Sequence, residues 1–155
     1  MDRETRATAH DHRALRLWLR LLTCSQLIER HVRSRLRGRF GITLPRFDLL
    51  SQLERHPDGL KMSELSRRMM VTGGNVTGIV DQLVKEGLVE RLDDECDRRA
   101  WRVRLTRAGD KAFAEMAHAH EDWVAELLSG LSRRDSDALM QLLARLKQAT
   151  LEKSA

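Results

Sequence analysis

The stretch that decides the fold is Val71-Thr-Gly-Gly-Asn-Val-Thr-Gly-Ile-Val-Asp-Gln-Leu-Val-Lys-Glu-Gly-Leu88. Its apolar residues recur at helical spacing, so the sequence predicts a helix with one apolar face. Thr72 is the predicted N-cap, because its hydroxyl can accept a backbone N–H that has no partner inside the helix. Gly87 is predicted to end the helix as the residue after its C-cap. The apolar face consists of Val76, Ile79, Val80, Leu83 and Val84.

The opposite face of this predicted helix carries small or hydrogen-bonding residues, which crowd at its N-terminal end. Such a profile suits a helix that enters the major groove of DNA, which is about 12 Å wide. Glycines there let a helix approach closely, although each costs roughly 1 kcal/mol of helix stability by propensity. The residues of this face are Gly73, Gly74, Asn75, Thr77, Gly78, Asp81 and Gln82.

After Gly87 the apolar spacing changes from helical to alternating. Residues 88–92 and 101–105 therefore read as two short antiparallel strands, and the polar segment 93–100 between them reads as a hairpin tip. A helix with a groove-compatible face followed by an arginine-bearing hairpin indicates a winged helix-turn-helix. The predicted fold class is mainly α with a small β-hairpin wing. The pattern alone leaves open a domain of this fold that touches no DNA.

Both ends of the chain carry long amphipathic patterns around this compact unit. Residues 14–40 and 107–152 are predicted as a helical dimerisation lobe, and residues 43–106 as the DNA-binding lobe of a single domain spanning 1–155. Residues 1–13 are polar and are expected to form a loose arm or a frayed first turn. The terminal helices have little domain to cover their apolar stripes, so we expect a symmetric dimer on a palindromic operator. An intrachain helical cap on a monomer is the alternative.

Shorter signals place the remaining helix ends. Thr43 and Thr106 are predicted N-caps, and the first long helix is expected to end near Gly38 or Gly41. Residues 56–59 read as a turn before a short helix over 62–70, whose cap position holds Lys61 or Met62. Ser132 followed by Asp135 predicts the start of the last helix.

Three motifs in order, Val76–Arg91, Asp97-Arg-Arg99 and Val103-Arg-Leu-Thr-Arg-Ala-Gly109, resemble the MarR (multiple antibiotic resistance regulator) family. The similarity covers roughly Leu15 to Leu146, and the ordered combination is more specific than any one motif. The resemblance implies a DNA-binding transcriptional regulator, most often a repressor, that pairs its first, fifth and sixth helices in a homodimer.

The predicted DNA contacts divide into base readers and phosphate holders. Asn75 and Thr77 lie on the first turns of the helix, where Asn can pair with adenine and a Thr methyl can meet thymine. Thr72 and Gln82 are better placed for phosphates or the groove rim. Gly73, Gly74 and Gly78 permit close approach; many family members carry Arg at the position of Gly78, so the operator sequence is left open.

The wing supplies the second set of predicted contacts. By resemblance, Asp97 orients Arg99, and Arg99 enters the minor groove, where a narrow A·T-rich groove attracts a guanidinium. Arg98 and Arg102 are expected to hold phosphates.

Composition limits the other classes of function. A formal charge of +5 favours a polyanionic partner, and the low aromatic content of 4% with no Tyr argues against base stacking on an aromatic platform. No apolar run approaches a membrane span and no signal peptide is evident, so we expect a cytoplasmic protein. We predict no enzyme activity, cofactor or metal, because no catalytic motif is present and His118 and His120 point to different helix faces.

The resemblance further implies an effector, a small aromatic acid or its CoA thioester, which releases the DNA. An aromatic wall and a cation for a carboxylate are available in the first two helical segments, although core packing and solvated cations would explain the same residues. A redox-responsive repressor using Cys24 is a rival, against which a buried inert thiol is expected. The candidate effector residues are Trp18, Leu22, His31, Arg46 and Phe47.

Overall fold

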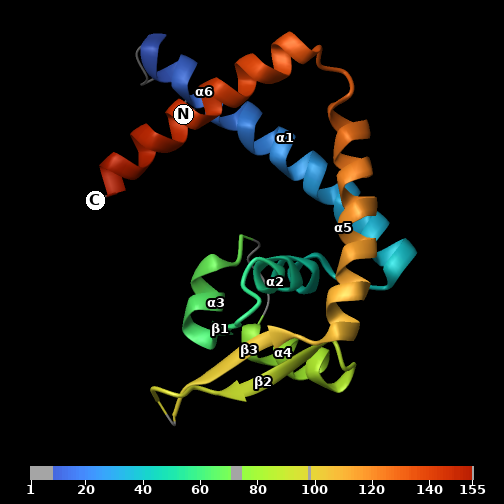
Figure 1. Ribbon diagram of the computed structural model, residues 1–155. Coiled ribbons are helices and arrows are strands. Elements are labelled where there is room, and N and C mark those ends of the chain that lie inside the picture. The colour runs from blue at the N-terminus through green and yellow to red at the C-terminus, as the bar shows by residue number, and fades with distance from the viewer. Residues whose placement is uncertain (1–8, 71–74, 98, 155) are drawn as a thin grey trace, which may run out of the picture. The chain divides into compact units, whose positions relative to one another are not determined.

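The computed structural model describes residues 9–70, 75–97 and 99–154, with side chains from residue 12 onward. It divides into two compact units, Met1–Glu121 and Asp122–Ala155. Helices dominate, and the three strands form a small antiparallel sheet, which confirms the predicted fold class (Figure 1). The elements in chain order are α1 (Ala9–Phe40), α2 (Leu44–Glu54), β1 (Leu60–Lys61), α3 (Met62–Arg68), α4 (Val76–Lys85), β2 (Val89–Asp93), β3 (Trp101–Leu105), α5 (Arg107–Leu128) and α6 (Arg133–Ser154).

The core of the first unit is built around α2. Eight of its eleven residues are buried, so the helix is covered on nearly all sides rather than on one stripe. It contacts α1, α3 and β3. Asp48 is buried with it, and its Oδ2 accepts a hydrogen bond of 2.7 Å from the backbone N–H of Met70. The side chains with the least exposure are Leu36, Leu49, Leu50, Leu53, Leu65, Leu83, Val80, Val89 and Val103.

The sheet has the order β1-β3-β2, and both pairings are antiparallel. β2 and β3 are the predicted hairpin, and Figure 1 shows them projecting from the helices as a wing. β1 was not predicted, because two residues are too short for an alternating pattern. It pairs Leu60 with Val103 and Lys61 with Arg102. Gly59 has φ +87, and a Cβ there would lie 2.7 Å from the carbonyl oxygen of Val103, so this close approach requires glycine.

Helix α1 begins earlier than expected. Residues 9–13 are helical, so of the two expectations for this segment the loose arm is wrong for them. Polarity alone does not stop a helix, and this segment contains neither Gly nor Pro. The end is as predicted: α1 stops at Phe40, and Gly41 takes the left-handed conformation with φ +64. Thr43 is the N-cap of α2, although its side chain makes no capping hydrogen bond.

Helix α4 begins later than expected. Its N-cap is Asn75, whose Oδ1 accepts a 3.4 Å hydrogen bond from the backbone N–H of Gly78. The prediction of Thr72 as the N-cap of this helix is therefore wrong, and Thr72 itself lies outside the described residues. Two glycines follow Thr72, and each would weaken a helix by roughly 1 kcal/mol, whereas Asn is among the best N-caps. Gly87 follows the C-cap with φ +74, as predicted.

Thr106, the predicted N-cap of α5, links the start of α5 to the end of α4 by hydrogen bonds. Its Oγ1 accepts a 3.0 Å hydrogen bond from the N–H of Gly109 and donates one of 2.6 Å to the carbonyl of Gly87. Its own N–H donates to the carbonyl of Leu88 at 3.0 Å. The first turn of α5 thereby lies directly against the backbone that links α4 to β2, with Gly109 buried between them.

The second unit contains the end of α5 and α6. The predicted start of α6 is confirmed, because Ser132 Oγ accepts a 3.1 Å hydrogen bond from the N–H of Asp135 and donates one of 2.6 Å to its Oδ2. None of the α6 residues is buried, and the side chains of its apolar stripe are 39–56% exposed. Along the described residues no helix is both long and apolar enough to span a bilayer. The stripe consists of Leu139, Leu142, Leu143 and Leu146.

Candidate nucleic-acid interface

Helix α4 has one buried and one open face. Val80 and Leu83 are fully buried, whereas Thr77, Gly78 and Gln82 are exposed. A Cβ on Gly78 would meet only the side chain of Asn75, at 3.7 Å or more, so packing does not require a glycine at this position. The open face therefore carries a small residue at Gly78 although no neighbouring atom of the protein requires one there. This is the geometry expected of a helix that another molecule approaches closely.

Asn75 lies at the border of this face rather than on the first helical turn, where it was predicted. It is exposed, but its side-chain oxygen is occupied by the Gly78 N–H. A base contact through that oxygen would have to compete with the cap, whereas its amide donors have no such commitment. Four other predicted contacts lie outside the described residues: Thr72, Gly73, Gly74 and Arg98.

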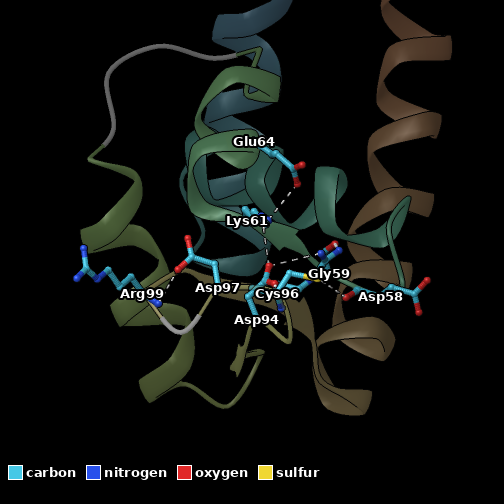
Figure 2. A network of polar contacts seen from close by, with 9 residues as sticks. Asp58, Gly59, Lys61, Glu64, Asp94, Cys96, Asp97 and Arg99 are labelled. Atoms are coloured by element: carbon cyan, nitrogen blue, oxygen red, sulfur yellow. Dashed lines mark hydrogen bonds and ion pairs between the residues drawn. The ribbon is translucent and has the colours of Figure 1, made fainter.

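The tip of the wing is shaped by Asp97. Its Oδ1 accepts a 3.0 Å hydrogen bond from the backbone N–H of Arg99, and its carbonyl accepts one of 3.0 Å from the N–H of Ala100. Asp97 thus holds the turn that contains Arg99, and it does so by accepting a hydrogen bond from the backbone of Arg99. The Arg99 side chain is exposed, and Figure 2 shows it pointing away from the other labelled residues.

Arg102 is engaged by the protein itself. Its Nη2 donates to the carbonyl of Gly59 at 2.9 Å, its Nε lies 3.4 Å from the carbonyl of Asp58, and its Nη1 lies 3.8 Å from Asp94 Oδ2. These contacts involve all three nitrogen atoms of the guanidinium. They favour a role in holding the root of the wing over the predicted role of phosphate contact.

Asp94 is a residue that sequence reasoning missed. It is buried, although both neighbours in the run Asp93-Asp-Glu95 are exposed. The hydrogen bond from the Cys96 N–H is the main cause that lowers the pKa of Asp94 below its ordinary value. The charges of Lys61 and Arg102 lower it further against the effect of burial. No local signal distinguishes this acid from its neighbours, because its partners come from β1 and β3.

A second connection joins the wing to α4. Arg91 on β2 forms an ion pair with Asp81 on α4, and its guanidinium lies 5.7 Å from the ring centroid of Trp101 on β3. The three residues form a chain from the helix across both strands of the hairpin. Trp101 is half exposed, so this series of three contacting residues borders the solvent-facing side of the wing.

The residues predicted to hold an effector have different surroundings in the structure. Phe47 is buried in the core, with its ring centroid 5.5 Å from that of Phe113 and 4.9 Å from that of His120. Arg46 forms an ion pair with Glu86, which is the C-cap of α4. On α1, Trp18 and His31 are exposed and Leu22 is half-buried.

The thiols and possible metal ligands were also placed. Cys24 is exposed, so the expectation of a buried thiol is wrong: among the described side chains of α1, the buried ones are Val32 and Leu36, towards its C-terminal end. Cys96 is exposed as well. Among the residues with described positions, no cluster of His, Cys, Asp or Glu has the arrangement of a metal site.

A helical pair α3–α4 followed by the β2–β3 wing, packed on α2, defines a winged helix-turn-helix protein. A family model described as the MarR family matches residues 40–100. The HTH-type transcriptional repressor MdtR of Bacillus subtilis (strain 168) is 32% identical over 109 residues, which are 70% of each chain. The chain belongs to the MarR family of transcriptional regulators.

Solved structures agree with this assignment. A MarR family transcriptional regulator from Silicibacter pomeroyi is 32% identical and has a TM-score of 0.79, covering 92% of this chain and 99% of its own. Sco3205 from Streptomyces coelicolor, solved in complex with DNA, has a TM-score of 0.75 at 23% identity and covers 92% of this chain and 89% of its own. At that identity the likeness concerns the fold.

Proposed function

We propose that this chain is a homodimeric repressor that binds a palindromic DNA operator through α4 and the wing. The observation that carries the proposal is the division of α4 into a buried apolar face and an exposed face of small and polar residues. The MdtR relative is named a repressor, and Sco3205 was solved with DNA on the same fold. The basic balance of the chain, +5 formally, adds attraction for a polyanion.

In this proposal α4 lies in the major groove and Arg99 reaches the adjacent minor groove. Thr77 and the Asn75 amide read base edges, Gln82 lies at the groove rim, and Gly78 allows the backbone to come close. The residues outside the described part keep their predicted roles: Thr72 and Arg98 at phosphates, Gly73 and Gly74 at the close approach. Asp97 acts indirectly, because it holds the turn that carries Arg99.

Arg99→Ala tests the wing contact. An operator is first obtained by selecting bound sequences from a random DNA pool, which also reports whether the site is palindromic. Affinity of the variant for that operator is then measured by fluorescence anisotropy and should fall by about 1–3 kcal/mol. Arg30→Ala on α1 is the matched control, since it removes the same charge from an exposed position outside the wing. Equal affinities of the two variants would contradict the wing contact.

The dimer is supported by the unpartnered apolar faces of α1 and α6. Leu15, Trp18 and Leu19 on α1 are at least half exposed, as are Leu142 and Leu151 on α6. An exposed apolar stripe on a helix marks an interaction site. A second copy is the occupant we propose, because a twofold partner would place two α4 helices about one helical turn of DNA apart.

Leu142→Glu tests the dimer. The charge would lie in the centre of the proposed interface, so sedimentation velocity should show monomers at concentrations where the wild type is dimeric. Gln141→Glu introduces an acid one residue away, on the opposite side of α6, and should leave the dimer intact. A wild type that sediments as a monomer would contradict this part of the proposal.

A small aromatic acid, or its CoA thioester, is the proposed effector, with Arg46 as the cation for its acidic group. Arg46 has a side chain only 12% exposed, and its Nε is buried without a hydrogen-bond partner in the structure. An anion within reach would satisfy that donor. A thermal-shift panel of benzoate, cinnamate and aromatic CoA esters tests this; binding raises Tm with ligand concentration in the wild type and not in Arg46→Gln.

The exposed thiol of Cys24 favours a second candidate, a repressor released by oxidants. Thiol oxidation needs an accessible sulfur, and Cys24 is exposed on α1. In this alternative, peroxide releases operator DNA from the wild type but not from Cys24→Ser. Retention of DNA by both proteins at the same peroxide concentration would exclude it.

A further inference from the structure

Asp94 is a buried acid at the root of an exposed loop. It directly follows β2, and its side chain is only 4% exposed, while Asp93 and Glu95 on either side are exposed. A carboxylate is costly to bury unless charges or hydrogen bonds compensate it. Its burial therefore indicates a specific set of partners.

The partners of Asp94 come from three parts of the chain. Oδ1 accepts a 2.8 Å hydrogen bond from the backbone N–H of Cys96, which bends the chain towards the tip. Oδ2 lies 3.5 Å from Lys61 Nζ on β1 and 3.8 Å from Arg102 Nη1 on β3, and it has no direct hydrogen bond. The backbone N–H of Asp94 donates to Ala100 O at 3.3 Å and closes the loop.

These contacts continue into the body of the winged unit (Figure 2). Arg102 is bound to the carbonyl of Gly59 in the turn before β1, at 2.9 Å. The backbone N–H of Lys61 donates to Glu64 Oε2 in the first turn of α3, at 3.2 Å. One carboxylate thus ties the outgoing strand of the wing to β1, to the preceding turn and to the start of α3.

We propose that Asp94 is a positioning residue for DNA binding, which directs the wing so that Arg99 reaches the minor groove. The inference rests on the proposed contact of Arg99 with DNA. Asp97 at the turn lies three positions beyond Asp94, a reach of at most roughly 10 Å. A rotation of about 15° at the root would move the tip by roughly 2–3 Å over that reach, enough to displace a guanidinium from its site.

Electrostatics alone predicts that loss of the Asp94 charge would strengthen DNA binding, the opposite of what lost positioning would do. Removing an acid near DNA reduces repulsion of the phosphates and should strengthen binding. In Asp94→Asn the carboxylate charge is lost and Lys61 and Arg102 are released, which would add further attraction. Weaker binding of this variant therefore reports lost positioning and not lost charge.

The experiment measures operator affinity for Asp94→Asn, Asp93→Asn, Arg99→Ala and the double variant Asp94→Asn/Arg99→Ala. Asp93→Asn removes the same charge from the exposed neighbouring position and should bind as tightly as the wild type or more tightly. Asp94→Asn should bind about tenfold more weakly, a loss within the range of coupled residues. In the Arg99→Ala background the same substitution should change affinity by less than about twofold. Thermal unfolding of each variant confirms that it is folded at the assay temperature.

Three results would overturn the inference in distinguishable ways. If Asp94→Asn binds as tightly as Asp93→Asn, the acid does not position the wing, while the DNA contact of Arg99 still stands. If Asp94→Asn loses as much affinity in the Arg99→Ala background as in the wild type, its effect is general and does not act through Arg99. If Arg99→Ala itself leaves affinity unchanged, the proposed wing contact fails and the inference fails with it.

Discussion

Gly109 lies where the first turn of α5 meets the backbone between α4 and β2. A Cβ built on it would be 1.8 Å from the carbonyl oxygen and 2.8 Å from the carbonyl carbon of Leu88, distances that real Cβ atoms do not adopt. Both atoms belong to backbone, so no side-chain rotation relieves the overlap. In Gly109→Ala the start of α5 must therefore move away from Leu88.

The size of the effect follows from the contacts at this junction. A shift of about 1 Å or more would stretch the hydrogen bonds from Thr106 N to Leu88 O, 3.0 Å, and from Thr106 Oγ1 to Gly87 O, 2.6 Å. Overpacking costs about 1–3 kcal/mol and each hydrogen bond about 1 kcal/mol, whereas Ala gains up to about 1 kcal/mol in helix propensity. We expect Gly109→Ala to lower the unfolding free energy by about 2–4 kcal/mol and Tm by roughly 5–15 °C.

Urea unfolding followed by circular dichroism measures this change, at one fixed protein concentration because the stability of the proposed dimer would depend on it. Gly38→Ala is the matched control: Gly38 lies inside α1, and a Cβ there would meet nothing within 4 Å. It should gain about 0.5–1 kcal/mol through the less flexible unfolded chain. A Gly109→Ala protein as stable as the wild type, or shifted in the same direction as Gly38→Ala, would refute this account of the junction.

Three further predictions follow from individual residues. Asn75→Ala removes the α4 cap and should lower the unfolding free energy in urea by about 0.5–1 kcal/mol, the lower part of the usual range because the bond is 3.4 Å long and exposed. Burial lowers the pKa of His120 below 6.5, so the unfolded chain takes up the proton first; stability should fall as pH drops below 6.5, and less so in His120→Phe, by urea unfolding at pH 7.5, 6.5 and 5.5. Gly78→Arg has room for its side chain and should steepen the slope of log affinity against log salt by about one unit, by anisotropy titration.

Short-range signals in the sequence were sufficient for most of the winged unit. The apolar spacing of α4, the left-handed Gly87 and the cap at Thr106 each involve residues within a few positions of one another, and the structure has all three. The strands β2 and β3 follow the alternation of apolar residues to within one residue at each end. Local periodicity determines such elements because their hydrogen bonds close over short distances along the chain.

Features that depend on distant partners were not accessible in this way. β1 has two residues and exists only through its register with Val103 and Arg102. Asp94 cannot be told from Asp93 until that register brings Lys61 beside it. The exposure of Cys24 could not be predicted for the same reason. Periodicity predicts an apolar stripe on α1, but it does not show how far along α1 the other helices extend.

The two polar connections of the wing join the same hairpin to two different neighbours. Arg91 on β2 forms an ion pair with Asp81 on α4. Asp94, which directly follows β2, forms an ion pair with Lys61 on β1. A hairpin held by one of these contacts could still rotate about it, whereas attachment to both α4 and β1 restricts rotation of the wing relative to α4. Ordering the wing before DNA arrives lowers the entropic cost of binding, so the groove contacts proposed for α4 and the wing could form together. An effector that releases DNA would then have to displace α4 and the wing as one body.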